Sequence, residues 1–155
     1  MVLTKLKQII VLSGRPNSGK TAILNALCDK VLVSKFMTAH NPAEQESGRS
    51  RTGDQRFTAQ YHGNKLAICT AGDTADHIFK SFLYAEKWNV EVLVLALSIP
   101  PRSSSYKTAE EAFKAIVRLH RLSSLVDQSD VTTYAPPKPK GYVDTVKVSD
   151  LFKKI

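Results

Sequence analysis

The sequence has few of the features that mark disulfide-rich or membrane-spanning proteins. Only two of its 155 residues are cysteines, Cys28 and Cys69, and their spacing fits neither a metal site nor a disulfide scaffold. No apolar run reaches the roughly 18 residues that a membrane-spanning helix needs, and polar residues interrupt the first twelve positions, where a signal peptide would be apolar. We therefore expect one cytoplasmic domain over residues 1–155, with reduced core cysteines and no membrane span.

The chain also lacks a dense block of charge, although its net charge of +8 is large for its length. Lysine and arginine are spread along the sequence, and no recognised nucleic-acid-binding motif gathers them. Two interpretations stay open. The charge indicates a polyanionic partner, such as nucleic acid or an acidic protein, or it only solvates the surface, which the even spread favours.

One short motif carries most of the functional information. Residues 14–21 fit the pattern G-x-x-x-x-G-K-[ST], after a strand-like stretch over 5–12 and before a helix-like stretch from Ala22. Glycines let the main chain approach a phosphate, the helix start offers unpaired N–H groups, and a lysine adds a point charge. The predicted phosphate-binding residues are Gly14, Arg15, Pro16, Asn17, Ser18, Gly19, Lys20, Thr21 and Ala22, with Thr21 also a magnesium ligand.

The remaining pattern predicts strands that alternate with helices. We expect a β-hairpin over 56–70, a helix from Asp73 or Thr74 to about Trp88, a strand over 89–98, a helix from Thr108 to about Leu125, a short strand over 130–135 and a last helix from about Thr145. Such alternation predicts an α/β fold, a three-layer, doubly wound and mostly parallel sheet whose antiparallel hairpin strand lies at the edge.

Two further segments are expected to approach the phosphates. The strand over 65–70 ends in Ala71-Gly72-Asp73, which places Gly72 and Asp73 at the edge of the sheet where ligands bind. The polar stretch over 40–54 is predicted to be a loop, and it carries Arg49, Arg51, Thr52 and Asp54. An arginine there is a candidate to stabilise phosphoryl charge and Thr52 a candidate magnesium contact; the other interpretation is a flexible, solvated loop.

Residues 14–21 resemble the Walker A motif of P-loop nucleoside triphosphatases and kinases. The order of motif, helix, polar loop, hairpin and Cys69-Thr70-Ala71-Gly72 resembles the core of small GTPases, over roughly the first hundred residues. The resemblance implies that Lys20 contacts phosphate, that Thr21 binds magnesium and that the Gly72 N–H faces the γ-phosphate. Asp73 then falls where that family often has a water-positioning glutamine.

The sequence departs from that family in two places. Cys69 replaces the family's magnesium-site aspartate, and the guanine-selecting Asn-Lys-x-Asp pattern is absent after the 89–98 strand. ATP is therefore expected in preference to GTP. Asp73 is assigned either to magnesium, through water, or to the attacking nucleophile, although helix capping would also explain it. Tyr134 and residues 136–141 occupy the position expected for the nucleotide base.

Three functions stay open. The favoured one is an enzyme, a Mg²⁺-dependent nucleoside triphosphatase in which Lys20, Asp73, Arg49 and Arg51 act on the γ-phosphate. The second is a small kinase that transfers this phosphate to a metabolite or nucleic-acid hydroxyl. The third is a nucleotide-dependent binding module with little catalysis. The chain also resembles short bacterial or phage ATP-binding proteins with an Ala-Gly-Asp or Trp-Gly-Asp strand end.

Overall fold

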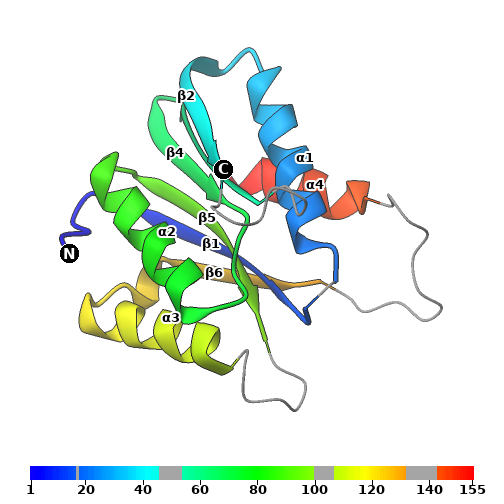
Figure 1. Cartoon of the computed structure of the whole chain (residues 1–155). Helices are drawn as coiled ribbons and strands as arrows, with labels where there is room; N and C mark the ends of the chain where they lie inside the picture. The colour runs from blue at the N-terminus through cyan, green and yellow to red at the C-terminus, as the bar shows by residue number, and fades with distance from the viewer. Residues whose placement is uncertain (17, 46–53, 100–106, 132–142) are drawn as a thin grey trace.

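The computed structural model of the protein describes residues 1–16, 18–45, 54–99, 107–131 and 143–155. Strands and helices alternate along these ranges (Figure 1). The strands are β1 (Gln8–Gly14), β2 (Met37–Gln45), β3 (Gln55–Tyr61), β4 (Asn64–Cys69), β5 (Val92–Ser98) and β6 (Val126–Asp130). The helices are α1 (Lys20–Leu32), α2 (Ala75–Lys87), α3 (Lys107–Leu119) and α4 (Thr145–Lys154), with a short 3-10 turn at Ser123–Leu125.

The described strands form one mixed sheet in the order β2-β3-β4-β5-β1-β6. Strand β1 pairs in parallel with β5 and β6, and β4 pairs in parallel with β5. Strand β3 runs antiparallel to both of its neighbours, β2 and β4. The predicted α/β class and the predicted hairpin are confirmed. The prediction that the hairpin lies at the edge is wrong, because β2 pairs with β3 on its outer side.

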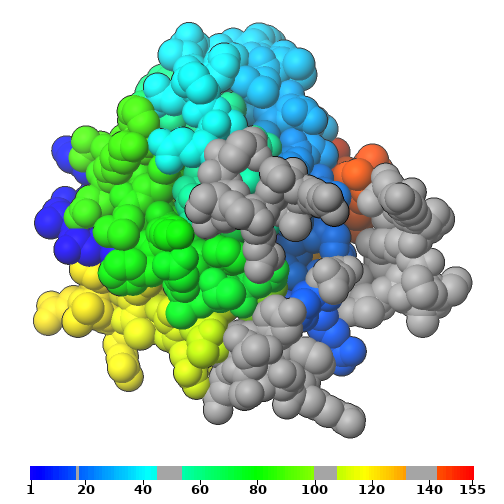
Figure 2. All heavy atoms as spheres, in the orientation of Figure 1, coloured from blue at the N-terminus to red at the C-terminus, as the bar shows by residue number. Residues whose placement is uncertain are grey.

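Helices cover both faces of this sheet. Helices α2 and α3 pack together on one face, where Figure 2 shows them side by side in green and yellow, and α1 and α4 pack together on the other. The side chains of β1 alternate between the two layers: Ile9 and Val11 join the core under α2 and α3, whereas Ile10 and Leu12 join the core under α1 and α4. The predicted three-layer arrangement is therefore confirmed.

Two strands differ from the sequence prediction. Residues 40–45 were predicted to begin a loop, but they belong to β2, whose pairing with β3 is irregular between Asn41 and Glu44, around Pro42. An edge strand tolerates a proline because only one of its sides is paired, and it tolerates polar side chains here because residues 38–40 and 42–44 are exposed. The last strand was predicted over 130–135, but β6 covers Val126–Asp130 and carries few apolar residues. Residues 132–135 lie outside the described part of the chain.

Local hydrogen bonds explain where two helices begin and end. Thr74 is the N-cap of α2, because its side chain accepts a hydrogen bond from the His77 main-chain N–H at 3.2 Å. Asp73 therefore precedes the cap. Helix α3 ends at Leu119, earlier than predicted, because Arg121 takes a left-handed φ of 56° and the Leu122 N–H bonds to the Val117 carbonyl at 2.8 Å.

The direction of each strand decides which residues meet at the sheet edge that carries the predicted motif. Strands β1, β4 and β5 all end there, because they are parallel. The antiparallel strand β3 begins at the same edge, so that Arg56 lies opposite Cys69, near the end of β4. Residues just before β3 therefore approach the residues that follow β4, which were the predicted site.

Candidate functional site

The turn between β1 and α1 places a buried lysine under its own main chain. Gly19 is the N-cap of α1 and adopts a left-handed φ of 91°, which a glycine takes without steric cost. Lys20 opens the helix, and only 6% of its surface is exposed. Its Nζ donates hydrogen bonds to the carbonyl oxygens of Gly14 (3.2 Å) and Arg15 (2.7 Å) and to Ser18 Oγ (3.3 Å).

The surroundings of Lys20 disfavour its charge. Burial lowers the pKa of the Lys20 ammonium from its ordinary value, and the nearby negative charge of Asp73 partly opposes this shift. The three acceptors on the turn are neutral carbonyl and hydroxyl oxygens. A buried ammonium that holds only neutral acceptors gains from an anion brought to it. The turn is therefore chemically suited to receive an anion.

A buried carboxylate contacts the hydroxyl group of Thr21. Asp54, which immediately precedes β3, is only 4% exposed. Its Oδ1 accepts hydrogen bonds from the hydroxyl groups of Thr21 (3.0 Å) and Thr70 (3.3 Å). Thr70 follows β4 and also accepts the Gln55 main-chain N–H at 2.8 Å. One carboxylate thus joins the first turn of α1, the start of β3 and the end of β4.

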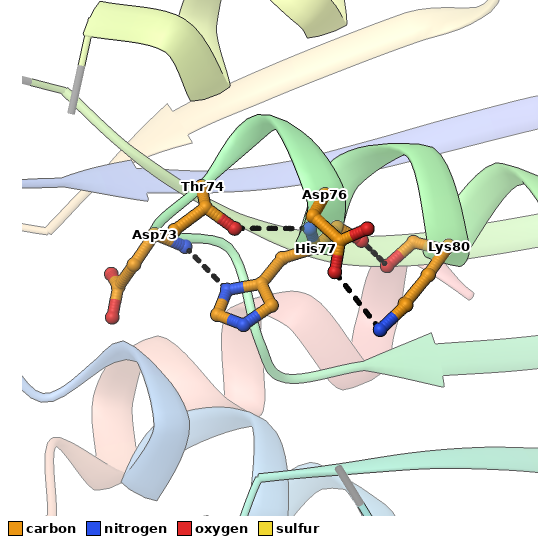
Figure 3. Close-up of polar contacts among 6 residues, drawn as sticks. Asp73, Thr74, Asp76, His77 and Lys80 are labelled. Carbon is orange, nitrogen blue, oxygen red and sulfur yellow. Dashed lines mark hydrogen bonds and ion pairs between the residues drawn. The ribbon is translucent and has the colours of Figure 1, made fainter. Parts of the chain in front are cut away.

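Asp73 also lines the cavity, and its contacts include hydrogen bonds to Ser98 and His77. The fully buried Ser98 hydroxyl, at the end of β5, donates a hydrogen bond to Asp73 Oδ1. The Asp73 main-chain N–H donates to Nδ1 of His77 at 3.3 Å, and this imidazole is only 6% exposed (Figure 3). In Figure 3 the carboxylate of Asp73 points away from α2, while the imidazole lies beside the main chain that leads into the helix.

Gly72 allows the chain to cross close to β5. A Cβ atom at this position would lie 2.1 Å from the Ala96 carbonyl oxygen, far inside contact distance. The Gly72 carbonyl instead accepts a hydrogen bond from the Ser98 N–H at 3.0 Å. The glycine is thus explained by this close main-chain contact, and the predicted role of its N–H toward a γ-phosphate stays a prediction.

These groups line a cavity of about 490 Å³. Its lining residues come from the first turns of α1, the start of β3 and the segment after β4: Ser18, Gly19, Lys20, Thr21, Ala22, Asn25, Asp54, Thr70, Gly72 and Asp73. The structure therefore brings seven predicted site residues to one cavity and adds three that the sequence analysis did not assign to it, namely Asn25, Asp54 and Thr70.

The other predicted residues have different positions. Gly14 and Arg15 contribute carbonyl oxygens to Lys20, but they do not line the cavity, and neither does Pro16. The predicted contacts from Asn17, Arg49, Arg51 and Thr52, and the predicted base site at Tyr134 and 136–141, lie outside the described residues.

The donor set in the cavity suits a hard divalent cation that also contacts a phosphate. No cluster of three or more histidine, cysteine, aspartate or glutamate side chains that could hold a metal exists among the described residues. Magnesium does not need one, since it typically uses one or two carboxylates or hydroxyls, with water and substrate phosphates as its other ligands. Thr21 and Asp54 offer such oxygens 3.0 Å apart. Cys69 is fully buried in the core.

The comparisons with known proteins found no matching family model, curated protein or solved structure. Among the described helices, none is both long and apolar enough to cross a membrane.

Proposed function

We propose that this protein binds a nucleoside triphosphate in the cavity beside α1 and hydrolyses its γ-phosphate with the help of Mg²⁺. The observation that supports this most directly is the buried Lys20 ammonium, held on neutral oxygens of the turn between β1 and α1 and facing a cavity of about 490 Å³. The start of α1 adds unpaired N–H groups and the positive end of the helix dipole. Among the described residues, the hydrogen bonds of the Lys20 ammonium go to neutral oxygens, so a phosphate would supply the negative partner that it lacks in direct contact.

The two carboxylates suit different tasks. Asp54 contacts the Thr21 hydroxyl, so we assign this pair to Mg²⁺, which when bound would neutralise phosphate charge. Asp73 is held by Ser98 instead, and its charge acts on Lys20. We assign Asp73 to orient the attacking water and to accept its proton. This division revises the expectation that Asp73 also serves the metal.

Lys20 has to change partners when a phosphate arrives. In the structure, its three hydrogen bonds go to oxygens of the turn. A phosphate oxygen is a stronger acceptor for an ammonium than a neutral carbonyl, since both partners are then charged. We therefore expect Nζ to turn toward the ligand, while the turn itself keeps its position. Because the base site falls outside the described residues, the preference for ATP over GTP rests on the absent guanine-selecting pattern alone.

Calorimetry and a γ-labelled substrate test this proposal. Titration with ATP and Mg²⁺ should give saturable heat, and Lys20→Ala should weaken the affinity at least about tenfold, about 1.4 kcal/mol. Lys30→Ala is the matched control, because Lys30 lies in the last turn of the same helix and bonds to Ser149 at 3.4 Å. Absence of binding by ATP, GTP, CTP and UTP would refute the proposal.

The fate of the label separates the possible reactions. Release as inorganic phosphate supports hydrolysis. Transfer of the label to a metabolite or an oligonucleotide end would instead support a kinase, and tight binding without either product would support a nucleotide-dependent binding module. The Asp73→Asn variant should lower the rate of γ-phosphate release about 100-fold, a typical contribution of a general base, with little change in ATP affinity.

A further inference from the structure

The imidazole of His77 has an unusual place next to the proposed site. It is buried at the start of α2, and its Nδ1 accepts the main-chain N–H of Asp73 at 3.3 Å (Figure 3). This contact is not part of the helix cap, because Thr74 caps α2 with its own side chain. Capping of α2 therefore does not require the hydrogen bond between the imidazole and Asp73.

The contact fixes the residue that precedes the cap. The Asp73 N–H precedes the first turn of α2 and so has no place in the hydrogen bonds of the helix. With His77 as acceptor, the main chain of Asp73 is anchored to α2, and with Ser98 as donor, its carboxylate is anchored to β5. Two anchors on separate elements limit rotation of this residue in a way that neither achieves alone.

The contact also defines the state of the imidazole. An Nδ1 atom that accepts a hydrogen bond must carry a lone pair, so this contact requires the tautomer with its proton on Nε2. An imidazole in this state at the Asp73 main chain acts as an acceptor and cannot serve there as an acid. His77 does not line the cavity, so any effect on the reaction must act through Asp73.

We propose that His77 is a positioning residue that holds Asp73 in the orientation required for attack on the γ-phosphate. This inference rests on the proposed function and deepens it, because it names what aligns the carboxylate. Misplacing a reacting group by about 1 Å costs on the order of 100-fold in rate. Loss of the acceptor at Nδ1 should therefore reduce turnover, whereas nucleotide affinity, which depends on Lys20 and the start of α1, should stay the same.

Three substitutions at this position separate positioning from packing. His77→Ala removes the ring, His77→Leu keeps apolar bulk without an acceptor, and His77→Asn places an amide oxygen near the position of Nδ1. We expect kcat for ATP hydrolysis to fall about 10- to 100-fold in the Ala and Leu variants, with KM close to that of the wild type. His77→Asn should recover most of the lost kcat. Equal kcat values in all four proteins would overturn the inference, as would loss in the Asn variant equal to that in the Leu variant.

Ser81→Ala is the matched control for a general disturbance of α2. The Ser81 hydroxyl donates to the His77 carbonyl at 2.9 Å, so this variant perturbs the same turn but leaves the imidazole contact intact. Its kcat should stay near that of the wild type, and a loss as large as that of His77→Leu would overturn the inference. Thermal unfolding of each variant shows which of them are folded.

A measurement on the wild-type protein keeps the inference testable even if the variants do not fold. Ring nitrogen NMR at neutral pH should show His77 with its proton on Nε2 and an unprotonated Nδ1; a proton on Nδ1 would overturn the inference. Failure of the proposed function has a different signature, because the wild-type protein would then bind no nucleotide or would bind it without releasing phosphate. Wild-type hydrolysis with unchanged His77 variants would refute only the positioning role.

Discussion

Replacing Asp54 by asparagine tests the proposed division of labour between the two carboxylates. The change keeps the shape of the side chain and one carbonyl oxygen but removes its negative charge. In the wild-type protein, Oδ1 of Asp54 accepts the hydroxyl groups of Thr21 and Thr70 at 3.0 and 3.3 Å. An asparagine oxygen can accept both bonds. We therefore expect the fold to survive and the magnesium dependence to change.

The size of the effect follows from Coulomb's law. A carboxylate and a divalent cation about 4 Å apart attract by about 8 kcal/mol at an effective dielectric constant of 20, twice the value for two unit charges. Each 1.4 kcal/mol changes an equilibrium constant about tenfold. If competition from water leaves only about a sixth of this attraction, the Mg²⁺ concentration that gives half-maximal activity should still rise about tenfold. The hydrogen bonds change less, because a neutral acceptor loses only about 1 kcal/mol relative to a charged one.

The assay is the rate of phosphate release as a function of Mg²⁺ at saturating ATP. Asp127→Asn is the matched control, because Asp127, on β6, makes an ion pair with Lys154 of α4 at 3.1 Å and does not line the cavity. Asp73→Asn should lower the maximal rate without moving the Mg²⁺ midpoint. If Asp54→Asn leaves the midpoint in place and Asp73→Asn shifts it, the assignment of the metal to Asp54 is wrong.

Three further predictions concern stability. Because burial lowers the pKa of Lys20, its charge destabilises the fold at pH values below that pKa. In thermal unfolding, Lys20→Met should therefore have an unchanged or higher melting temperature, and ATP should no longer raise it. Gly72→Ala should lower the melting temperature by roughly 5 °C or prevent folding, because overpacking costs about 1–3 kcal/mol. Gly63→Ala is the comparison: a Cβ there would have no atom within 4 Å, so the variant should lose only about 1 kcal/mol of stability, for its φ of 77°. Burial, and to a smaller extent Cys69, raises the pKa of the Cys28 thiol from 9.0 to about 12, so the folded state keeps a proton that the unfolded state loses above pH 9. The free energy of unfolding should therefore fall from pH 9 upward, by about 3 kcal/mol at pH 11 in denaturant titrations, and it should fall less in Cys28→Ala.

Much of the fold is predictable because its signals are local. The β1 strand and α1 follow from an apolar run, a glycine-rich turn and a helical stripe within one stretch of sequence. The hairpin follows from the His62-Gly63 turn, whose two residues have φ angles of 50° and 77°. The fully buried strand β5 follows from its unbroken apolar composition. In each case the residues that fix the element lie within the element.

The two strands whose positions were predicted wrongly, β2 and β6, depend on partners that are distant in the sequence. Strand β2 contains a proline and several polar residues, so its own sequence predicts a loop, and only pairing with β3 makes it a strand. Strand β6 is also at an edge, and its five residues, Val126–Asp130, include a single apolar one. These edge strands need apolar alternation less than central strands, because their faces are less covered: no residue of β6 is buried, whereas every residue of β5 is. Sequence periodicity therefore identifies central strands more reliably than edge strands.

The sequence analysis placed Asp54 at the end of the predicted loop but gave it no role, for a topological reason. The sequence analysis sought acids after the ends of strands, where parallel strands present their ligands, and found Asp73. Asp54 comes before a strand, and it reaches the same edge only because β3 runs antiparallel to β4. Its position directly before the predicted hairpin, opposite Thr70, was a usable signal once the direction of that strand was considered.

The end of β5 holds two parts of the proposed site in place, the turn that carries Lys20 and the segment that carries Asp73. The Ile99 N–H bonds to the Gly14 carbonyl at 3.0 Å, and the preceding Ser98 N–H bonds to the Gly72 carbonyl, also at 3.0 Å. Successive residues of one strand thus hold the turn that carries Lys20 and the segment that carries Asp73, and Ser98 adds its hydroxyl bond to the Asp73 carboxylate. Because β5 lies between β1 and β4 and is buried along its length, these anchors are supported by the core on both faces. The separation of the turn that carries Lys20 from the segment that carries Asp73 is therefore set by main-chain contacts with the sheet, as electrostatic preorganisation of the proposed site would require.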